Sequence, residues 1–118
     1  MKIYLILFLT FLLFSCSKSE ESFSACMLEN PIENIAWLKK IKNNFMLSSF
    51  YQKREIVQYT YNNETVFLVD ACVGCADNLT TVYNCEGIVI CEFGGIAGLN
   101  TCPDFGTSST NKKVLWEN

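Results

Sequence analysis

The sequence predicts a small α+β domain in which one N-terminal helix packs on an antiparallel sheet of about four strands, arranged as two hairpins and braced by disulfides. Two patterns support this fold class. Apolar residues recur every three to four positions over residues 35–45, whereas β-branched and aromatic residues dominate the short runs after residue 53. The 118 residues leave room for one domain. A domain of about 90 residues commonly needs disulfides to supplement its core.

The expected helix begins at Asn30, a good capping residue, with Pro31 at the first helical position and Glu33 placed as in a capping box. Its apolar stripe consists of Ile35, Leu38, Ile41 and Phe45. Three lysines within residues 39–42 lie toward the C-terminal end, where the helix dipole favours cations. We interpret them as a solvated helix end rather than a binding patch. Asn43-Asn44 is the expected stop.

Two hairpins are expected after the helix. The first joins strands at 54–61 and 65–69 through Asn62-Asn63, because asparagine tolerates the positive φ of a two-residue loop. The second joins strands at 81–84 and 88–93 through a turn at residues 85–87.

The C-terminal part carries weaker signals. Gly94, Gly95 and Gly98 are expected to end regular structure, and residues 102–105 are expected to form a pinned loop. Residues 112–116 fit either a short edge strand or a tail that lays Trp116 on the core.

The first fifteen residues predict a signal peptide. Lys2 supplies a positive start, and residues 3–14 are apolar except for Thr10. Twelve residues span about 18 Å as a helix, which is short of a hydrocarbon core of roughly 30 Å. The run ends in Leu13-Phe14-Ser15-Cys16, which resembles a bacterial lipobox, although Phe14 stands where a smaller residue is usual.

The lipobox implies that Cys16 becomes the mature N-terminus and carries acyl chains such as palmitate, a durable membrane anchor. Residues 16–25 are then the lipidated cysteine and a flexible, serine-rich tether, and residues 26–118 are the cysteine-rich domain. The alternative is a secreted protein cleaved elsewhere. Lys18-Ser19-Glu20-Glu21 resembles the acidic signal that sends some Bacteroidota-type lipoproteins to the cell surface, but a charged tether explains the same residues.

Cysteine parity supports this interpretation, because removing Cys16 from seven cysteines leaves an even six. Three structural disulfides are the leading hypothesis for the six, which are Cys26, Cys72, Cys75, Cys85, Cys91 and Cys102. Cys85 and Cys91 lie about 20 Å apart on one extended arm and are not expected to pair. Cys91 is expected to bond the loop that holds Cys72 and Cys75, and Cys102 is expected to pin the glycine-rich segment.

Two other uses of the cysteines stay open. Cys72-Val73-Gly74-Cys75 is a CxxC motif, so a thiol–disulfide redox protein is one alternative. No βαβ pattern surrounds the motif, however, and Asp77-Asn78 favours a loop rather than a helix behind it. A four-cysteine zinc site is the other alternative, but it lacks a second short-spaced pair.

Composition narrows the remaining chemistry. With no histidine, the chain cannot use Ser-His-Asp or Cys-His catalysis, and a net charge of −3 argues against nucleic acid as a partner. No cofactor is expected. Acidic residues near turns are interpreted as solvated, and they are Asp70, Asp77, Glu86, Glu92 and Asp104. Aromatic residues fit either the core or a sticky surface for sugars or a partner, and they are Trp37, Tyr51, Tyr59, Tyr61, Tyr83 and Trp116.

From Glu29 onward the chain resembles a family of small, uncharacterised bacterial (Bacteroidota-type) lipoproteins. The resemblance rests on Trp37-Leu38-Lys39, Gln58-Tyr59-Thr60-Tyr61 and Thr65-Val66-Phe67, on residues 82–91 with their YNCEG sequence, and on residues 93–105. It implies a lipid-anchored location in the bacterial cell envelope, on the periplasmic face or the cell surface, and it supplies no activity. We therefore expect a non-enzymatic binding or structural module with an envelope protein or glycan partner. A redox protein or an enzyme-inhibiting module is the alternative.

Overall fold

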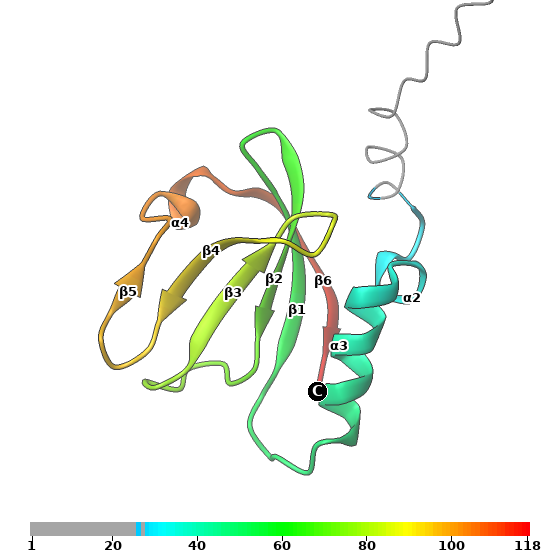
Figure 1. Cartoon of the computed structure of the whole chain (residues 1–118), viewed down its shortest axis with the longest axis horizontal. Coiled ribbons are helices and arrows are strands. Elements are labelled where there is room, and N and C mark those ends of the chain that lie inside the picture. Colours follow the sequence, from blue (N-terminus) through cyan, green and yellow to red (C-terminus); the bar gives the residue numbers. More distant parts are fainter. Residues whose placement is uncertain (1–25, 27) are drawn as a thin grey trace, which may run out of the picture.

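The computed structural model describes residue 26 and residues 28–118, and these form a mostly β structure around one antiparallel sheet (Figure 1). The sheet has six strands in the order β5-β4-β3-β2-β1-β6. Their bounds are β1 Glu55–Tyr61, β2 Glu64–Asp70, β3 Leu79–Tyr83, β4 Val89–Gly94, β5 Leu99–Asn100 and β6 Thr110–Glu117. None of the helices in the described part of the chain is long and apolar enough to cross a membrane.

The predicted α+β architecture with about four strands is therefore wrong. The prediction lacks the edge strand β5, and at the other edge β6 confirms the edge-strand alternative for residues 112–116. β5 has two residues, too few to show any periodicity. The first half of β6, Thr110–Lys113, is polar because it is exposed at the edge, so its sequence lacks the alternation of a half-buried strand.

Both hairpins have a local cause. Asn62 and Asn63 take positive φ values of 50° and 62° between Tyr61 and its partner Glu64, which confirms the predicted two-residue loop. In the β3–β4 turn, the Asn84 carboxamide oxygen accepts the backbone N–H groups of Glu86 and Ile88. Gly87 follows with a φ of 79° and lies against Trp37, whose ring would be 3.1 Å from an added Cβ, so this turn requires glycine.

The predicted single helix is divided. α2 covers Pro31–Asn34 and α3 covers Ala36–Leu47, with Ile35 in an extended conformation between them. The capping box is also wrong: Asn30 is left-handed, with a φ of 56°, and its side chain forms no cap. Pro31 disfavours the helical region for the residue before it, and Ile35 is buried where it breaks the helix. α3 continues through Asn43-Asn44 to Leu47.

The sheet buries apolar residues on both faces. The helix face carries α2 and α3, and its buried cluster is Cys26, Ile32, Ile35, Leu38, Ile56, Phe67 and Val69. The α4 face carries the short helix α4, Phe105–Ser108, and its cluster is Val57, Tyr61, Val66, Leu68, Val82, Cys91 and Phe105. Neighbours such as Ile56 and Val57 therefore point to opposite sides, as the strand pleat requires.

The open edge of β6 is protected against pairing with another strand. Its register with β1 shifts between Ile56 and Val57 and again between Gln58 and Thr60. Bulges and lysines both discourage a further strand, and Lys112 and Lys113 lie in this strand.

Candidate binding surface

The six cysteines of the described residues form three disulfides: Cys26–Cys85, Cys72–Cys75 and Cys91–Cys102. Disulfide bonding is therefore confirmed, and the Cys102 bridge does pin the glycine-rich segment. The predicted bridge from Cys91 to the Cys72–Cys75 loop is wrong. Cys91 lies opposite Val82 on the α4 face, whereas the loop joins β3 at Leu79, opposite Gly94 and about 10 Å further along β4. Cys16 lies outside the described residues.

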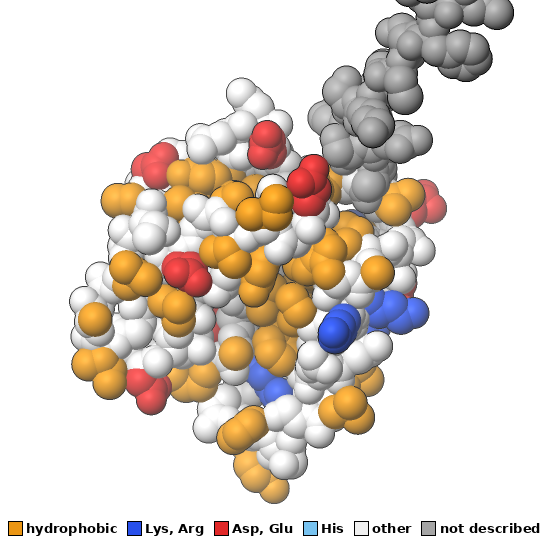
Figure 2. Space-filling model, in the orientation of Figure 1, with side chains coloured by type: hydrophobic (Ala, Val, Ile, Leu, Met, Phe, Trp, Pro, Cys, Tyr) orange, Lys and Arg blue, Asp and Glu red, His pale blue; other side chains and the backbone are white. Residues whose placement is uncertain are grey.

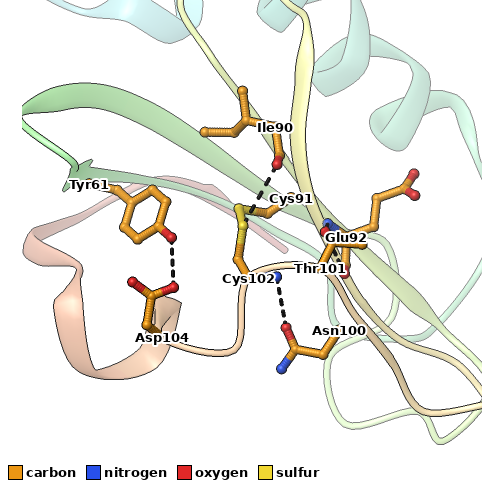
Figure 3. The surroundings of a disulfide bond; sticks show 8 residues. All are labelled: Tyr61, Ile90, Cys91, Glu92, Asn100, Thr101, Cys102 and Asp104. Atoms are coloured by element: carbon orange, nitrogen blue, oxygen red, sulfur yellow. Dashed lines mark hydrogen bonds between the residues drawn. A yellow bond between two sulfur atoms is a disulfide. The ribbon is translucent and has the colours of Figure 1, made fainter.

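Cys102 is held in place for its bridge (Figure 3). The Asn100 carboxamide oxygen accepts the Cys102 N–H at 3.0 Å, and Thr101 exchanges hydrogen bonds with the backbone of Glu92. Beside the bridge, the Tyr61 hydroxyl donates to Asp104 Oδ1 at 2.8 Å. This bond raises the pKa of Tyr61 above its ordinary value. The bridge and this hydrogen bond together fasten α4 to the sheet.

Cys72–Cys75 lies in the β2–β3 loop, and its surroundings favour a structural role. The Asp70 carboxylate accepts the Cys72 N–H at 3.0 Å and the Asn78 amide at 2.7 Å. A carboxylate beside the motif disfavours a thiolate, whereas reactive CxxC pairs have a helix N-terminus or a cation nearby. No helix follows the motif within residues 71–78.

The other predicted site residues do not converge. Among residues 26 and 28–118, no three His, Cys, Asp or Glu side chains gather as metal ligands would. Asp70 and Asp104 each accept a hydrogen bond that holds a loop. Gly94 has a φ of 108° and passes so close to Asn78 that an added Cβ would lie 2.6 Å from its carbonyl oxygen, a packing role and not phosphate binding.

Most of the candidate aromatic residues belong to the two clusters and not to a surface. Trp37, Tyr83 and Trp116 pack against the helix-face cluster, and Tyr59 and Tyr61 belong to the α4 face. Tyr51 alone among the six is fully exposed.

A groove opens on the helix face because α3 crosses the strands obliquely. Trp37 in its first turn contacts Tyr83 of β3, with ring centroids 5.2 Å apart, whereas Phe45 in its last turn contacts Trp116 of β6 at 5.7 Å. The helix therefore diverges from β3 toward its C-terminal end. The hollow left there has a volume of about 290 Å³.

The lining of this α3–β3 groove is mainly apolar and carries no charged side chain; it consists of Ile41, Asn44, Phe45, Val69, Ala71, Leu79, Thr81 and Tyr83. Figure 2 shows apolar side chains gathered along the line between α3 and the neighbouring strands. Apolar concavities with a few polar groups are the usual sites for ligands and partner side chains.

The loop that leaves the groove is held by a buried cation. Arg54 is only 4% exposed, and its Nη atoms donate to the carbonyl oxygens of Phe45 at 2.9 Å, Phe50 at 2.8 Å and Ser48 at 3.4 Å. Its guanidinium also lies 5.5 Å from the centre of the Phe45 ring. These bonds satisfy carbonyls at the C-terminal end of α3, which favours a cation.

Arg54 thereby fixes a loop whose side chains point into solvent. We call this loop, together with the last two residues of α3, the clamped loop; its exposed apolar residues are Met46 and Leu47 in α3 and Phe50 and Tyr51 after it. Sequence reasoning missed the loop; the available signal was the apolar residues at the end of the helix and after it, followed by a lone arginine directly before β1.

A family model described as a domain of unknown function (DUF6970) matches residues 46–118. Comparison with curated proteins and comparison with solved structures each gave no match. The matched region begins at the clamped loop and contains all six strands.

Proposed function

The chain belongs to the DUF6970 family, and because that description names no activity, we propose from its own residues that it is a lipid-anchored, non-enzymatic binding module of the bacterial cell envelope. Cys16 carries the acyl chains, residues 17–25 form the tether, and the disulfide-braced domain presents the binding surface. A Bacteroidota-type lipoprotein on the periplasmic face or the cell surface is the setting that the N-terminal sequence favours.

The observation that carries the binding role is the pairing of the α3–β3 groove with the clamped loop. Phe45 belongs to both, since its ring lines the groove and its carbonyl oxygen accepts a bond from Arg54. A loop that is already ordered loses little conformational entropy on binding. Exposed apolar side chains beside an apolar hollow are the usual mark of an interaction site.

Cysteine pairing supports the anchor. The parity argument requires the six cysteines after Cys16 to pair among themselves, and they do. Three disulfides also fit an oxidising compartment outside the cytoplasm.

The anchor is tested by Cys16→Ser, with Ser17→Ala as the matched control, in cells fed an alkyne analogue of palmitate. We expect the control to carry the label and to stay with the membranes through a high-salt wash, because acyl chains hold it there. Cys16→Ser should lose the label and be released by the wash. Retention of unlabelled Cys16→Ser after the wash would refute the anchor.

The groove is tested with the apolar dye 1-anilinonaphthalene-8-sulfonate. Ala71 lines the groove, whereas Ala97 lies in the exposed turn between β4 and β5. Ala71→Trp should fill the hollow and weaken dye binding about tenfold, the usual effect of losing about 1.4 kcal/mol. Ala97→Trp should leave dye binding unchanged, and equal binding by both variants would remove the groove as the site.

A further inference from the structure

Charge is strongly segregated in this chain. Residues 55–111 contain seven acidic side chains and no basic one. All basic side chains of the domain fall in or near α3 and in β6, and they are Lys39, Lys40, Lys42, Lys53, Arg54, Lys112 and Lys113. Figure 1 shows α3 beside the edge strand β6. Figure 2 shows Lys and Arg side chains at α3 and most acidic ones over the strands and turns away from it. We call α3, residues 48–54 and β6 the α3–β6 side.

The positive surplus of this side is only partly neutralised. Glu33 pairs with Lys39 at 3.5 Å and also with Lys42, and Glu117 pairs with Lys53 at 3.3 Å. The remaining lysines form no ion pair with any described residue, and they are Lys40, Lys112 and Lys113. All three are exposed.

The clamped loop extends this basic side at the C-terminal end of α3. Leu47 is 86% exposed, Phe50 is 70% exposed and Tyr51 is fully exposed. Aliphatic and aromatic side chains on a rigid loop beside lysines match the chemistry of an anionic membrane surface, which attracts cations and takes up apolar groups at headgroup depth.

The route of the chain allows such a contact. Cys26 is bonded to Cys85 near the start of the helices, and the twelve residues of α3 then rise about 18 Å to the clamped loop. The nine residues 17–25 reach at most about 30 Å. An anchor at Cys16 therefore leaves enough chain for both ends of α3 to meet the same bilayer.

We propose that the α3–β6 side lies on an anionic phospholipid bilayer, with Leu47, Phe50 and Tyr51 entering its headgroup region. This inference rests on the proposed lipid anchor, which holds the domain at the membrane and makes a second, weak contact effective. In this orientation the acidic strands β2–β5 face away from the membrane.

The test uses the lipidated chain in vesicles of phosphatidylglycerol and phosphatidylcholine, with brominated lipids as quenchers of tryptophan fluorescence. Tyr51→Trp places a probe in the clamped loop, and Phe50→Trp is a second probe there. Ile96→Trp is the matched control, since Ile96 is 89% exposed in the β4–β5 turn of the acidic part. Trp37 and Trp116 contribute equally to all variants and are subtracted with the parent protein.

We expect the loop probes to be quenched about twofold more than the control, and the excess to fall when Lys40, Lys112 and Lys113 are changed to Glu. It should also fall in vesicles of phosphatidylcholine alone. Equal quenching at positions 51 and 96 would overturn the proposal. Equal quenching is also the result expected if the loop binds a protein and not the membrane. The anchor is judged separately by the release of Cys16→Ser, so the two proposals can fail independently.

Discussion

A four-residue helix packs at the centre of the α4 face of the sheet, whereas the twelve residues of α3 leave a hollow on the helix face. α4 covers this centre through Phe105, whose ring centroid lies 5.1 Å from that of Tyr61, 5.3 Å from that of Tyr59 and 5.6 Å from that of Phe93. α3 is longer but crosses the strands obliquely, so it follows β6 at one end and β3 at the other. Whether a helix covers a sheet face completely therefore depends more on its direction across the strands than on its length. The candidate binding groove exists because α3 crosses the strands obliquely.

The two faces also differ in the disulfide that holds the covering helices to the sheet. Removing these bridges is expected to lower the free energy of unfolding more than any other change considered below. Cys26–Cys85 spans 59 residues and Cys91–Cys102 spans 11. The chain-entropy model gives about 4 kcal/mol for the first and about 3 kcal/mol for the second. We therefore expect Cys26→Ser/Cys85→Ser to lower the free energy of unfolding more than Cys91→Ser/Cys102→Ser.

Cys72→Ser/Cys75→Ser serves as the control for these pairs, because this bridge spans only three residues and belongs to neither cluster. Its expected loss is about 2 kcal/mol or less. Urea denaturation of the three double variants checks the order. A loss from the Cys72/Cys75 pair as large as that from the Cys26/Cys85 pair would contradict it.

The second expected effect concerns the clamp at the open end of the helix face. Arg54→Met removes a hydrogen-bond donor from three carbonyl oxygens, of which that of Phe45 keeps the Ser48 N–H, and we expect a loss of about 2–3 kcal/mol in the free energy of unfolding. Lys53→Met, which removes only a solvent-exposed ion pair with Glu117, should cost about 0.5 kcal/mol. Urea denaturation measures both. If the two variants lose the same stability, the clamp does not hold the loop.

A third test asks whether the two faces lose stability at opposite ends of the pH scale. On the helix face, the hydrogen bond from Lys42 keeps the pKa of Glu33 below its ordinary 4.5. This contribution to stability is present above pH 4.5 and is lost as the pH falls through the folded value. On the α4 face, the bond to Asp104 raises the pKa of Tyr61 above 10.0, so its contribution is present below pH 10 and is lost as the pH rises through the folded value.

Glu33→Gln should therefore flatten only the acid limb of the stability profile, and Tyr61→Phe only the alkaline limb. Urea denaturation across the pH range shows both. These are the smallest effects expected, because each variant alters the polar interactions of one side chain and leaves the packing of the two clusters in place. If Tyr61→Phe also changed the stability at acid pH, the two faces would not lose stability in separate pH ranges.

The hairpins could be predicted from the sequence, because the turn at Asn62-Asn63 and the turn at residues 85–87 follow local rules. A bridge from Cys102 that pins the glycine-rich segment could also be predicted, but its partner Cys91 could not. The edges of the sheet could not be predicted in the same way. The polar half of β6 and the two residues of β5 are strands only because β1 and β4 offer them partners. No local pattern records such a partner.

The candidate surface was likewise beyond prediction from local patterns. The groove depends on the angle between α3 and β3, which Trp37 and Phe45 set through contacts with residues far along the chain. The sequence around Arg54 gives no sign that its side chain binds three carbonyl oxygens. The cysteines were recognised as a disulfide framework, but the register that places Cys91 opposite Val82 decided its partner.

The position of β6 has a consequence for how the domain is made. β1 lies between β2, its neighbour in sequence, and β6, which follows every other element along the chain. Until β6 emerges during synthesis, strand β1 has one unpaired edge, and Leu115 and Trp116 cannot yet pack against the helix face. A chain halted before residue 110 would therefore expose a strand suited to pairing with other chains, and the domain can close only after its final strand has arrived.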